Sequence, residues 1–214
     1  MPKTEIDKFL LPQSVRIGLW KMTETETELC AKDVSLNELA KSLSGIKSQS
    51  RRLEVLSVRQ LLAEMLGYIP DVQHNEDGKP YLVTKSLAMN LSISHTKGYA
   101  AVILSEKCNV AIDIEYRSER VCRIADRFLR EDERPSTTEG KLLCWCAKET
   151  LYKLHSSDKL TFSEMRTCRL PQPNGPFRGT FLIENLRRKQ KITVYYVITA
   201  DFVLTYALET AEKM

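Results

Sequence analysis

Apolar residues recur at helical spacing in two long segments of this chain. Val55, Val58, Leu62 and Met65 share one side of a helix, so residues 48–67 are predicted to be helical up to a terminal glycine. A second long helix is predicted for residues 138–155, after a polar stretch around Pro135. Shorter helices are expected after the capping-box spacing of residues 35–38 and after Ser118.

Shorter apolar runs between these helices predict strands. The clearest ones cover residues 15–22, 90–94, 99–104 and 110–115, and further strands follow the second long helix. Residues 93–104 and 198–208 each place a polar break between two apolar strands, near the end of their half of the chain. A helix followed by such a hairpin therefore occurs twice, although two β-hairpins can also be alike by chance.

This repeated order predicts an α+β fold, in which two similar α/β halves are related by a pseudo-twofold axis. We expect an N-terminal half at residues 1–110 and a C-terminal half at residues 111–214, with the active site in the cleft between them. If both walls of the cleft come from one chain, a monomer suffices.

Composition places few further limits on the protein. Of 214 residues, 43% are apolar and 28% charged, and no apolar run approaches the roughly 20 residues that span a bilayer. The N-terminal residues lack a secretory pattern, so we expect a cytoplasmic protein without a membrane partner. The six cysteines and three histidines form no zinc-binding spacing, which favours reduced structural thiols.

The net charge of +4 is small and spread along the chain. Its densest basic run, residues 187–191, fits either an acidic partner or a solvated hairpin. Nucleic-acid binding through this run and Arg51, Arg52 and Arg59 is a weaker hypothesis, because the charge is modest and no nucleic-acid motif is present. We therefore expect no nucleic-acid partner.

Two carboxylates converge in the predicted strand at residues 110–115. Because side chains alternate between the faces of a strand, Asp113 and Glu115 share one face while Ile112 and Ile114 occupy the other. Such a pair suits Mg²⁺, which binds through one or two carboxylates and substrate phosphates. A solvated acidic face is the alternative interpretation.

Other charged residues could surround a phosphate. Glu149 and Lys153 are four residues apart on one helix, so they form either a surface ion pair or a metal ligand and a phosphate-binding cation. His95 follows Ser94 at the end of a strand, and Lys79 lies beside a turn. Arg52 and Arg59 are further phosphate candidates, each with a solvated side chain as its alternative.

Four segments resemble, in order and type, the signatures of phosphopantetheinyl transferases of the surfactin-synthetase-activating type. These segments are residues 78–80 (GKP), 90–95 (NLSISH), 111–115 (AIDIE) and 145–149 (WCAKE) with Lys153. The basic segment from about Lys47 to Arg59 extends the resemblance upstream. Ala111 occupies a position where the family usually has glycine, which is the smallest possible change.

The resemblance implies a role for each matching residue. The magnesium ligands would be Asp113, Glu115 and Glu149; the catalytic residues would be Glu149, Lys153 and Asp113; and the coenzyme A contacts would be Lys47, Arg51, Arg52, Lys79, Ser94, His95 and Lys153. Lys47, Arg51 and Arg52 are alternatives for the 3′-phosphate.

The resemblance also implies an activity. Such an enzyme transfers 4′-phosphopantetheine from coenzyme A to a serine of an apo acyl or peptidyl carrier protein, with Mg²⁺ as cofactor, and releases adenosine 3′,5′-bisphosphate. No motif marks the carrier-docking surface, so carriers of fatty-acid, polyketide and nonribosomal-peptide synthesis all stay candidates. The alternative is a non-catalytic module of the same fold that binds coenzyme A or a carrier protein.

Overall fold

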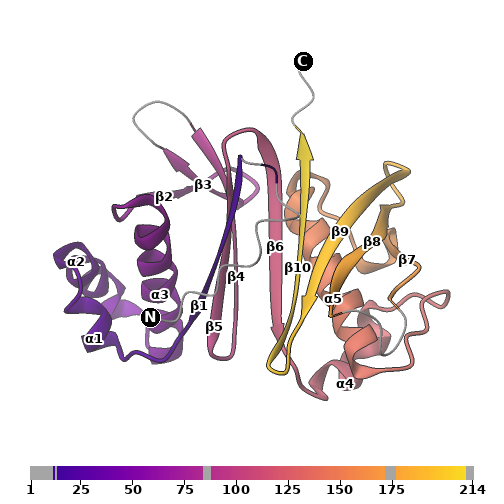
Figure 1. The fold of residues 1–214 in the computed structure, drawn as a ribbon, viewed down its shortest axis with the longest axis horizontal. Coiled ribbons are helices and arrows are strands. Elements are labelled where there is room, and N and C mark those ends of the chain that lie inside the picture. Colours follow the sequence, from indigo (N-terminus) through magenta and orange to yellow (C-terminus); the bar gives the residue numbers. More distant parts are fainter. Residues whose placement is uncertain (1–11, 13, 84–87, 172–176, 211–214) are drawn as a thin grey trace.

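The fold of this protein is built around two five-stranded sheets of identical topology (Figure 1). The structure is a computed structural model, and it describes residues 12, 14–83, 88–171 and 177–210. The strand orders are β1-β5-β4-β3-β2 and β6-β10-β9-β8-β7, so in each sheet the first strand pairs antiparallel with the last. This arrangement confirms the predicted α+β fold with two similar halves.

Each half has the same order of elements: one strand, then helices, then four strands that each pair with the next. The first half contains β1 (Val15–Lys21), α1 (Glu26–Cys30), α2 (Val34–Ser42), α3 (Gln49–Leu66), β2 (Val72–His74), β3 (Pro80–Val83), β4 (Ala88–Thr96) and β5 (Tyr99–Ser105). The second contains β6 (Cys108–Tyr116), α4 (Arg120–Phe128), α5 (Thr138–Leu154), β7 (Met165–Cys168), β8 (Arg178–Asn185), β9 (Gln190–Ile198) and β10 (Phe202–Thr210).

The ends of the long helices follow from local chemistry. The Ser48 side chain accepts a hydrogen bond from the Arg51 amide at the start of α3, and Gly67 ends the helix with a left-handed φ of 83°. The Thr137 side chain accepts from the Gly140 amide at the start of α5. Both helices were predicted from the sequence.

The predicted starts of the two shorter helices were wrong. Asp33 caps α2 by accepting from the Ser35 amide, so Ser35 already lies inside the helix. A carboxylate two residues earlier accepts from the free amides and also interacts favourably with the positive end of the helix dipole. At α4 the N-cap residue is Glu119, whose side chain accepts no hydrogen bond from a helix amide, and Ser118 precedes it.

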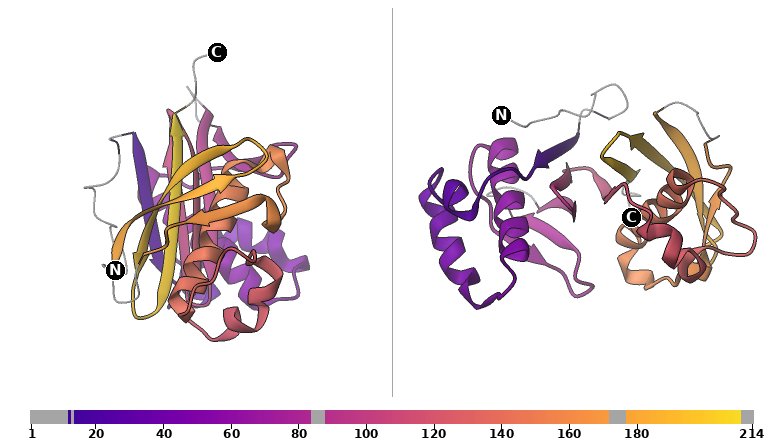
Figure 2. Two further views of the ribbon diagram at one scale, coloured as in Figure 1. Left: turned by 90° about the vertical axis from the view of Figure 1, so that its right-hand side faces the viewer. Right: turned by 90° about the horizontal axis from the view of Figure 1, so that it is seen from below.

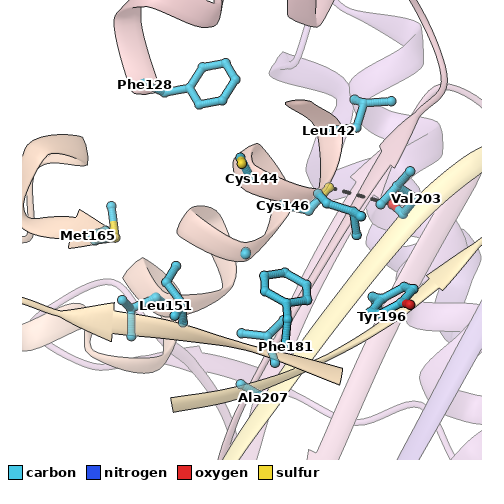
Figure 3. Close-up of a cluster of buried hydrophobic side chains, with 14 of the residues drawn as sticks. Phe128, Leu142, Cys144, Cys146, Leu151, Met165, Phe181, Tyr196, Val203 and Ala207 are labelled. Carbon is cyan, nitrogen blue, oxygen red and sulfur yellow. Dashed lines mark hydrogen bonds between the residues drawn. The ribbon is translucent and has the colours of Figure 1, made fainter. Parts of the chain in front are cut away.

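Each sheet buries one face under its own helices. Leu56, Leu61 and Leu62 of α3 pack over the first sheet. Beneath α5 lies the second cluster, in which Leu151 and Phe181 pack with Ala207, as Figure 3 shows. Cys144 and Cys146 belong to this cluster as free, buried thiols. Ala111, at the position where the family usually has glycine, is buried in the same cluster.

The opposite faces of the two sheets pack against each other. Along β5, Ala100, Val102 and Leu104 belong to the cluster under α3, whereas Ala101 and Ile103 contact residues of β6 and β10. The helices of the two halves therefore lie on opposite outer sides of the molecule, as the right-hand view of Figure 2 shows. Both faces of the central strands are buried, which explains their nearly continuous apolar sequences.

Side-chain hydroxyl groups join β4 to the free edge of β6. Three hydroxyls on alternate residues of β4 accept hydrogen bonds from three alternate backbone amides of β6, each 20 positions further along the chain. The pairs are Ser92 with Ile112 (3.2 Å), Ser94 with Ile114 (3.3 Å), and Thr96 with Tyr116 (3.0 Å). We call these three contacts the hydroxyl ladder. It satisfies amides that an edge strand would otherwise leave unpaired.

The basic run at residues 187–191 lies at the turn between β8 and β9 and at the start of β9. Arg187 pairs with Glu164 at 2.7 Å and Arg188 with Asp158 at 2.6 Å. The run is thus part of a hairpin, as one of its two interpretations predicted. Of the described helices, none has the length and apolar character needed to cross a membrane.

Lys148 forms a buried ion pair that fastens the loop after α4 to α5. Its Nζ atom lies 2.5 Å from Glu133 Oε2 and also donates to the Phe128 carbonyl. Glu133 in turn accepts from the amide and the hydroxyl of Thr167. Both ionic side chains are almost fully shielded from water.

We expect Lys148→Met to destabilise the fold by about 3 kcal/mol, because it leaves the Glu133 carboxylate buried without its cation. Urea unfolding followed by circular dichroism would measure the loss. Lys191→Met, at an exposed position of β9, is the matched control and should change stability by less than about 0.5 kcal/mol. Equal stabilities of the two variants would contradict the structural role of the pair.

Candidate functional site

A cleft of about 510 Å³ opens between the two halves. Its walls come from α3, β2, β3 and β4 on one side and from β6 and α5 on the other. The charged and polar lining residues are Arg51, Glu54, Arg59, His74, Ser94, His95, Asp113, Glu115, Trp145, Glu149 and Lys153. Seven of the ten site residues predicted from the sequence are in this set.

Asp113 lies at the deep end of the acidic group, with 4% of its surface exposed. Its Oδ1 atom accepts hydrogen bonds from Ser94 Oγ at 2.8 Å and from Lys153 Nζ at 2.7 Å. Within the described residues its buried Oδ2 atom has no hydrogen-bond partner. Both halves thus hold one oxygen of this carboxylate, while the other oxygen is buried with its hydrogen-bonding capacity unused.

Glu115 is one residue pair further along the same face of β6. Trp145 donates its indole Nε1–H to Oε1 at 2.9 Å, and Thr96 donates its hydroxyl to Oε2 at 3.3 Å. Burial raises the pKa of Glu115, as does the negative charge of Asp113, and the two hydrogen bonds oppose this effect. The two halves therefore each hold one oxygen of this carboxylate.

Glu149 faces these two acids from α5. Burial raises its pKa to about 7, and the charges of Asp113 and Glu115 act in the same direction while Lys153 opposes them. Lys153 pairs with Asp113 of β6, on the same wall of the cleft, and its Nζ also donates to the Ile112 carbonyl at 3.1 Å. It does so rather than forming the helical pair with Glu149 that was one interpretation of their spacing. Three acids thus share one lysine.

The donor set of this acidic group fits a hard divalent cation. The three carboxylates repel one another, one buried oxygen of Asp113 is unpaired, and oxygen ligands are those that Mg²⁺ prefers. In the part of the chain that the structure describes, no three His, Cys, Asp or Glu side chains are already close enough to form a metal-binding group. The acids would therefore have to move closer together around an ion.

His95 forms a charged group with residues of α3 at the opposite wall. Arg51 donates to His95 Nε2, and Glu54 lies 3.4 Å from His95 Nδ1 and 3.1 Å from Arg51 Nη1. Burial lowers the pKa of His95. His95 is the last residue but one of β4, which confirms its predicted place at the end of a strand.

The remaining predicted basic residues lie outside the main cleft. Arg52 turns away to Glu26, at 3.2 Å, and to the Ile46 carbonyl, at 2.7 Å. Lys47 is exposed and lies just before Ser48, the N-cap residue of α3. Helix geometry separates Arg51 from Arg52 by about 100°, which explains why only one of them reaches the cavity.

Lys79 lines a smaller adjoining pocket that shares Pro80, Ile93 and Lys153 with the main cleft. Its ammonium group donates to the Asn109 side chain, which itself donates to the Leu154 carbonyl at 2.9 Å. Burial lowers the pKa of Lys79 to about 8.

The sequence did not predict the contacts of several residues that lie in or beside the cleft. Thr96 and Trp145 hold Glu115, and Glu54 and His74 line the opposite wall. Arg59, considered only as a weak phosphate candidate, is also in the cleft, and burial lowers its pKa. Thr96 continues the alternate hydroxyl spacing of Ser92 and Ser94, which is the one signal that could have identified it.

Residues 109–207 match the model of the 4′-phosphopantetheinyl transferase superfamily. A domain of this superfamily is therefore present in the second half, and the match covers slightly less than half of the chain. It includes Asp113, Glu115, Trp145, Glu149 and Lys153. A search of curated proteins found no match.

We expect Glu149→Gln to stabilise the folded protein at pH 8 but hardly at all at pH 5. The Glu149 pKa rises from an ordinary 4.5 to about 7 on folding, so the folded state binds the extra proton and stability falls as the pH rises through this interval. Removing the charge should recover about 2 kcal/mol at pH 8. Thermal unfolding at both pH values would measure the difference, and an equal effect at both would contradict the raised pKa.

Proposed function

We propose that this protein is a 4′-phosphopantetheinyl transferase of the surfactin-synthetase-activating type, in which one chain supplies both halves of the cleft. It would transfer 4′-phosphopantetheine from coenzyme A to a serine of an apo acyl or peptidyl carrier protein. The observation that carries the proposal is the meeting of three acids and Lys153 from the superfamily domain with Arg51 and His95 from the other half. A pyrophosphate substrate and its counter-ion need such opposite charges side by side.

In this reaction the serine oxygen forms a bond with the β-phosphorus of coenzyme A, and the bond between this phosphorus and the bridging oxygen breaks. Asp113, Glu115 and Glu149 would hold Mg²⁺, which when bound supplies positive charge that neutralises the pyrophosphate. Lys153 would neutralise the charge that grows on the leaving adenosine 3′,5′-bisphosphate. Positioning and charge neutralisation supply most of the catalysis in such transfers.

Glu149 is the best-suited acceptor for the serine proton. Without a cation its pKa is about 7, and a bound Mg²⁺ would lower it, so the carboxylate would be ionised and able to accept a proton at neutral pH. The fixed hydrogen bonds of Asp113 and Glu115 suit them better for binding a cation than for moving a proton.

Mass spectrometry tests the activity directly. Incubation of an apo carrier protein with this protein, coenzyme A and Mg²⁺ should add one phosphopantetheine mass to the carrier, and a chelator should prevent the gain. Asp113→Ala and Glu149→Ala should each lower the rate at least about a thousandfold, since both remove groups at the reacting phosphates.

Asp126→Ala, on the exposed side of α4, is the matched control and should keep full activity. Coenzyme A binding without transfer to any of a panel of acyl and peptidyl carriers would favour the non-catalytic binding module. An active Asp113→Ala enzyme would contradict the metal assignment.

The two neighbouring arginines of α3 give a paired test of coenzyme A binding. Arg51→Ala should raise the KM for coenzyme A about tenfold, because a charged hydrogen bond to a phosphate is lost. Arg52→Ala should leave this KM within about twofold but lower the melting temperature, because Arg52 links α3 to Glu26 and Ile46. Steady-state kinetics and thermal unfolding distinguish the two, and the reverse pattern would assign the phosphate contact to Arg52.

A further inference from the structure

We propose that Thr96 is a positioning residue for Glu115, through which the first half of the protein sets the cation affinity of the second. The inference rests on the proposed metal role of Glu115. Thr96 belongs to β4, whereas Asp113, Glu115 and Glu149 all belong to elements of the other half. A carboxylate that faces the cleft is thus oriented from across it.

The hydroxyl of Thr96 is used in both directions. It accepts from the Tyr116 amide at 3.0 Å and donates to Glu115 Oε2 at 3.3 Å. The amide fixes the hydroxyl oxygen relative to β6, so the single hydroxyl proton is left to point at the carboxylate. Since Trp145 holds Oε1, both oxygens of Glu115 are oriented and each keeps a lone pair for a cation.

The three residues of the hydroxyl ladder differ in whether they also contact an acid. The Ser94 hydroxyl accepts from the Ile114 amide and donates to Asp113, the residue just before Ile114. Thr96 makes the same two contacts, with the Tyr116 amide and with Glu115. Ser92 caps the Ile112 amide, but the residue before Ile112 is Ala111, which offers no carboxylate. Ser92 therefore shares the structural contact and not the contact with an acid.

Titration calorimetry with Mg²⁺ alone tests the inference on the full-length protein. Thr96→Val, which keeps the side-chain shape, should weaken Mg²⁺ binding about five- to tenfold, the effect of one hydrogen bond to a charged group. Thr96→Ser should restore the affinity to within about twofold. Ser92→Ala should lower the melting temperature as Thr96→Val does, with unchanged Mg²⁺ affinity.

A double-mutant comparison isolates the route through Glu115. If Thr96 acts by orienting this carboxylate, Thr96→Val should have no further effect on Mg²⁺ affinity in a Glu115→Gln background. Unchanged Mg²⁺ affinity in Thr96→Val, with only a lower melting temperature, would overturn the inference. So would equal effects in both backgrounds, or a wild-type protein that binds no Mg²⁺.

Failure of the proposed function would look different. The expected order of Mg²⁺ affinities, together with no transfer to any carrier protein by the wild type, would reject the transferase assignment while supporting the role of Thr96. Transfer activity of the wild type, together with unaltered Mg²⁺ affinity in Thr96→Val, would support the transferase assignment and reject the role of Thr96.

Discussion

The way the two halves of this protein are joined depends on how the backbone amides and carbonyls at the free edge of β6 find hydrogen-bond partners. An edge strand carries unpaired amides and carbonyls, which are costly when buried and invite further strand pairing when exposed. Here β4 supplies three side-chain hydroxyls to the amides, and Lys153 supplies an ammonium group to the Ile112 carbonyl. The sheets are thereby joined without a continuous backbone ladder, and the junction leaves room for a cleft.

The same contacts organise the acidic group. Ile112, Ile114 and Tyr116 turn their amides toward β4, and the residues between them include Asp113 and Glu115. A hydroxyl that accepts from one amide therefore lies beside the carboxylate of the preceding residue. Burial and the negative charge of Asp113 raise the pKa values of Glu115 and Glu149, and this group of three acids has one lysine, so it keeps an excess of negative charge that a bound cation would relieve.

Sequence patterns predicted the parts of the fold that depend on local periodicity. Residues 49–66 and 138–154 are helical because their apolar spacing and terminal caps favour it, and the repeated helix and hairpin revealed the two halves. Predictions failed where two polar residues competed for one role, as with Asp33 and Ser35 at the start of α2. The sequence left a choice open where a helix separates neighbours: Arg51 lines the cleft and Arg52 does not.

By itself, the sequence determined the α+β class, the duplicated order of elements and the common face of Asp113 and Glu115, because each follows from the period of a single element. Only the tertiary structure decided that Lys153 pairs with Asp113, that Thr96 and Trp145 hold Glu115, and that Lys79 lies beside the main cleft. These contacts join residues from different elements, and their partners are set by how α5 packs on β6 and how β4 packs beside β6. Such packing brings together residues that are far apart in the chain, and the periodicity of a single element does not determine which of them meet.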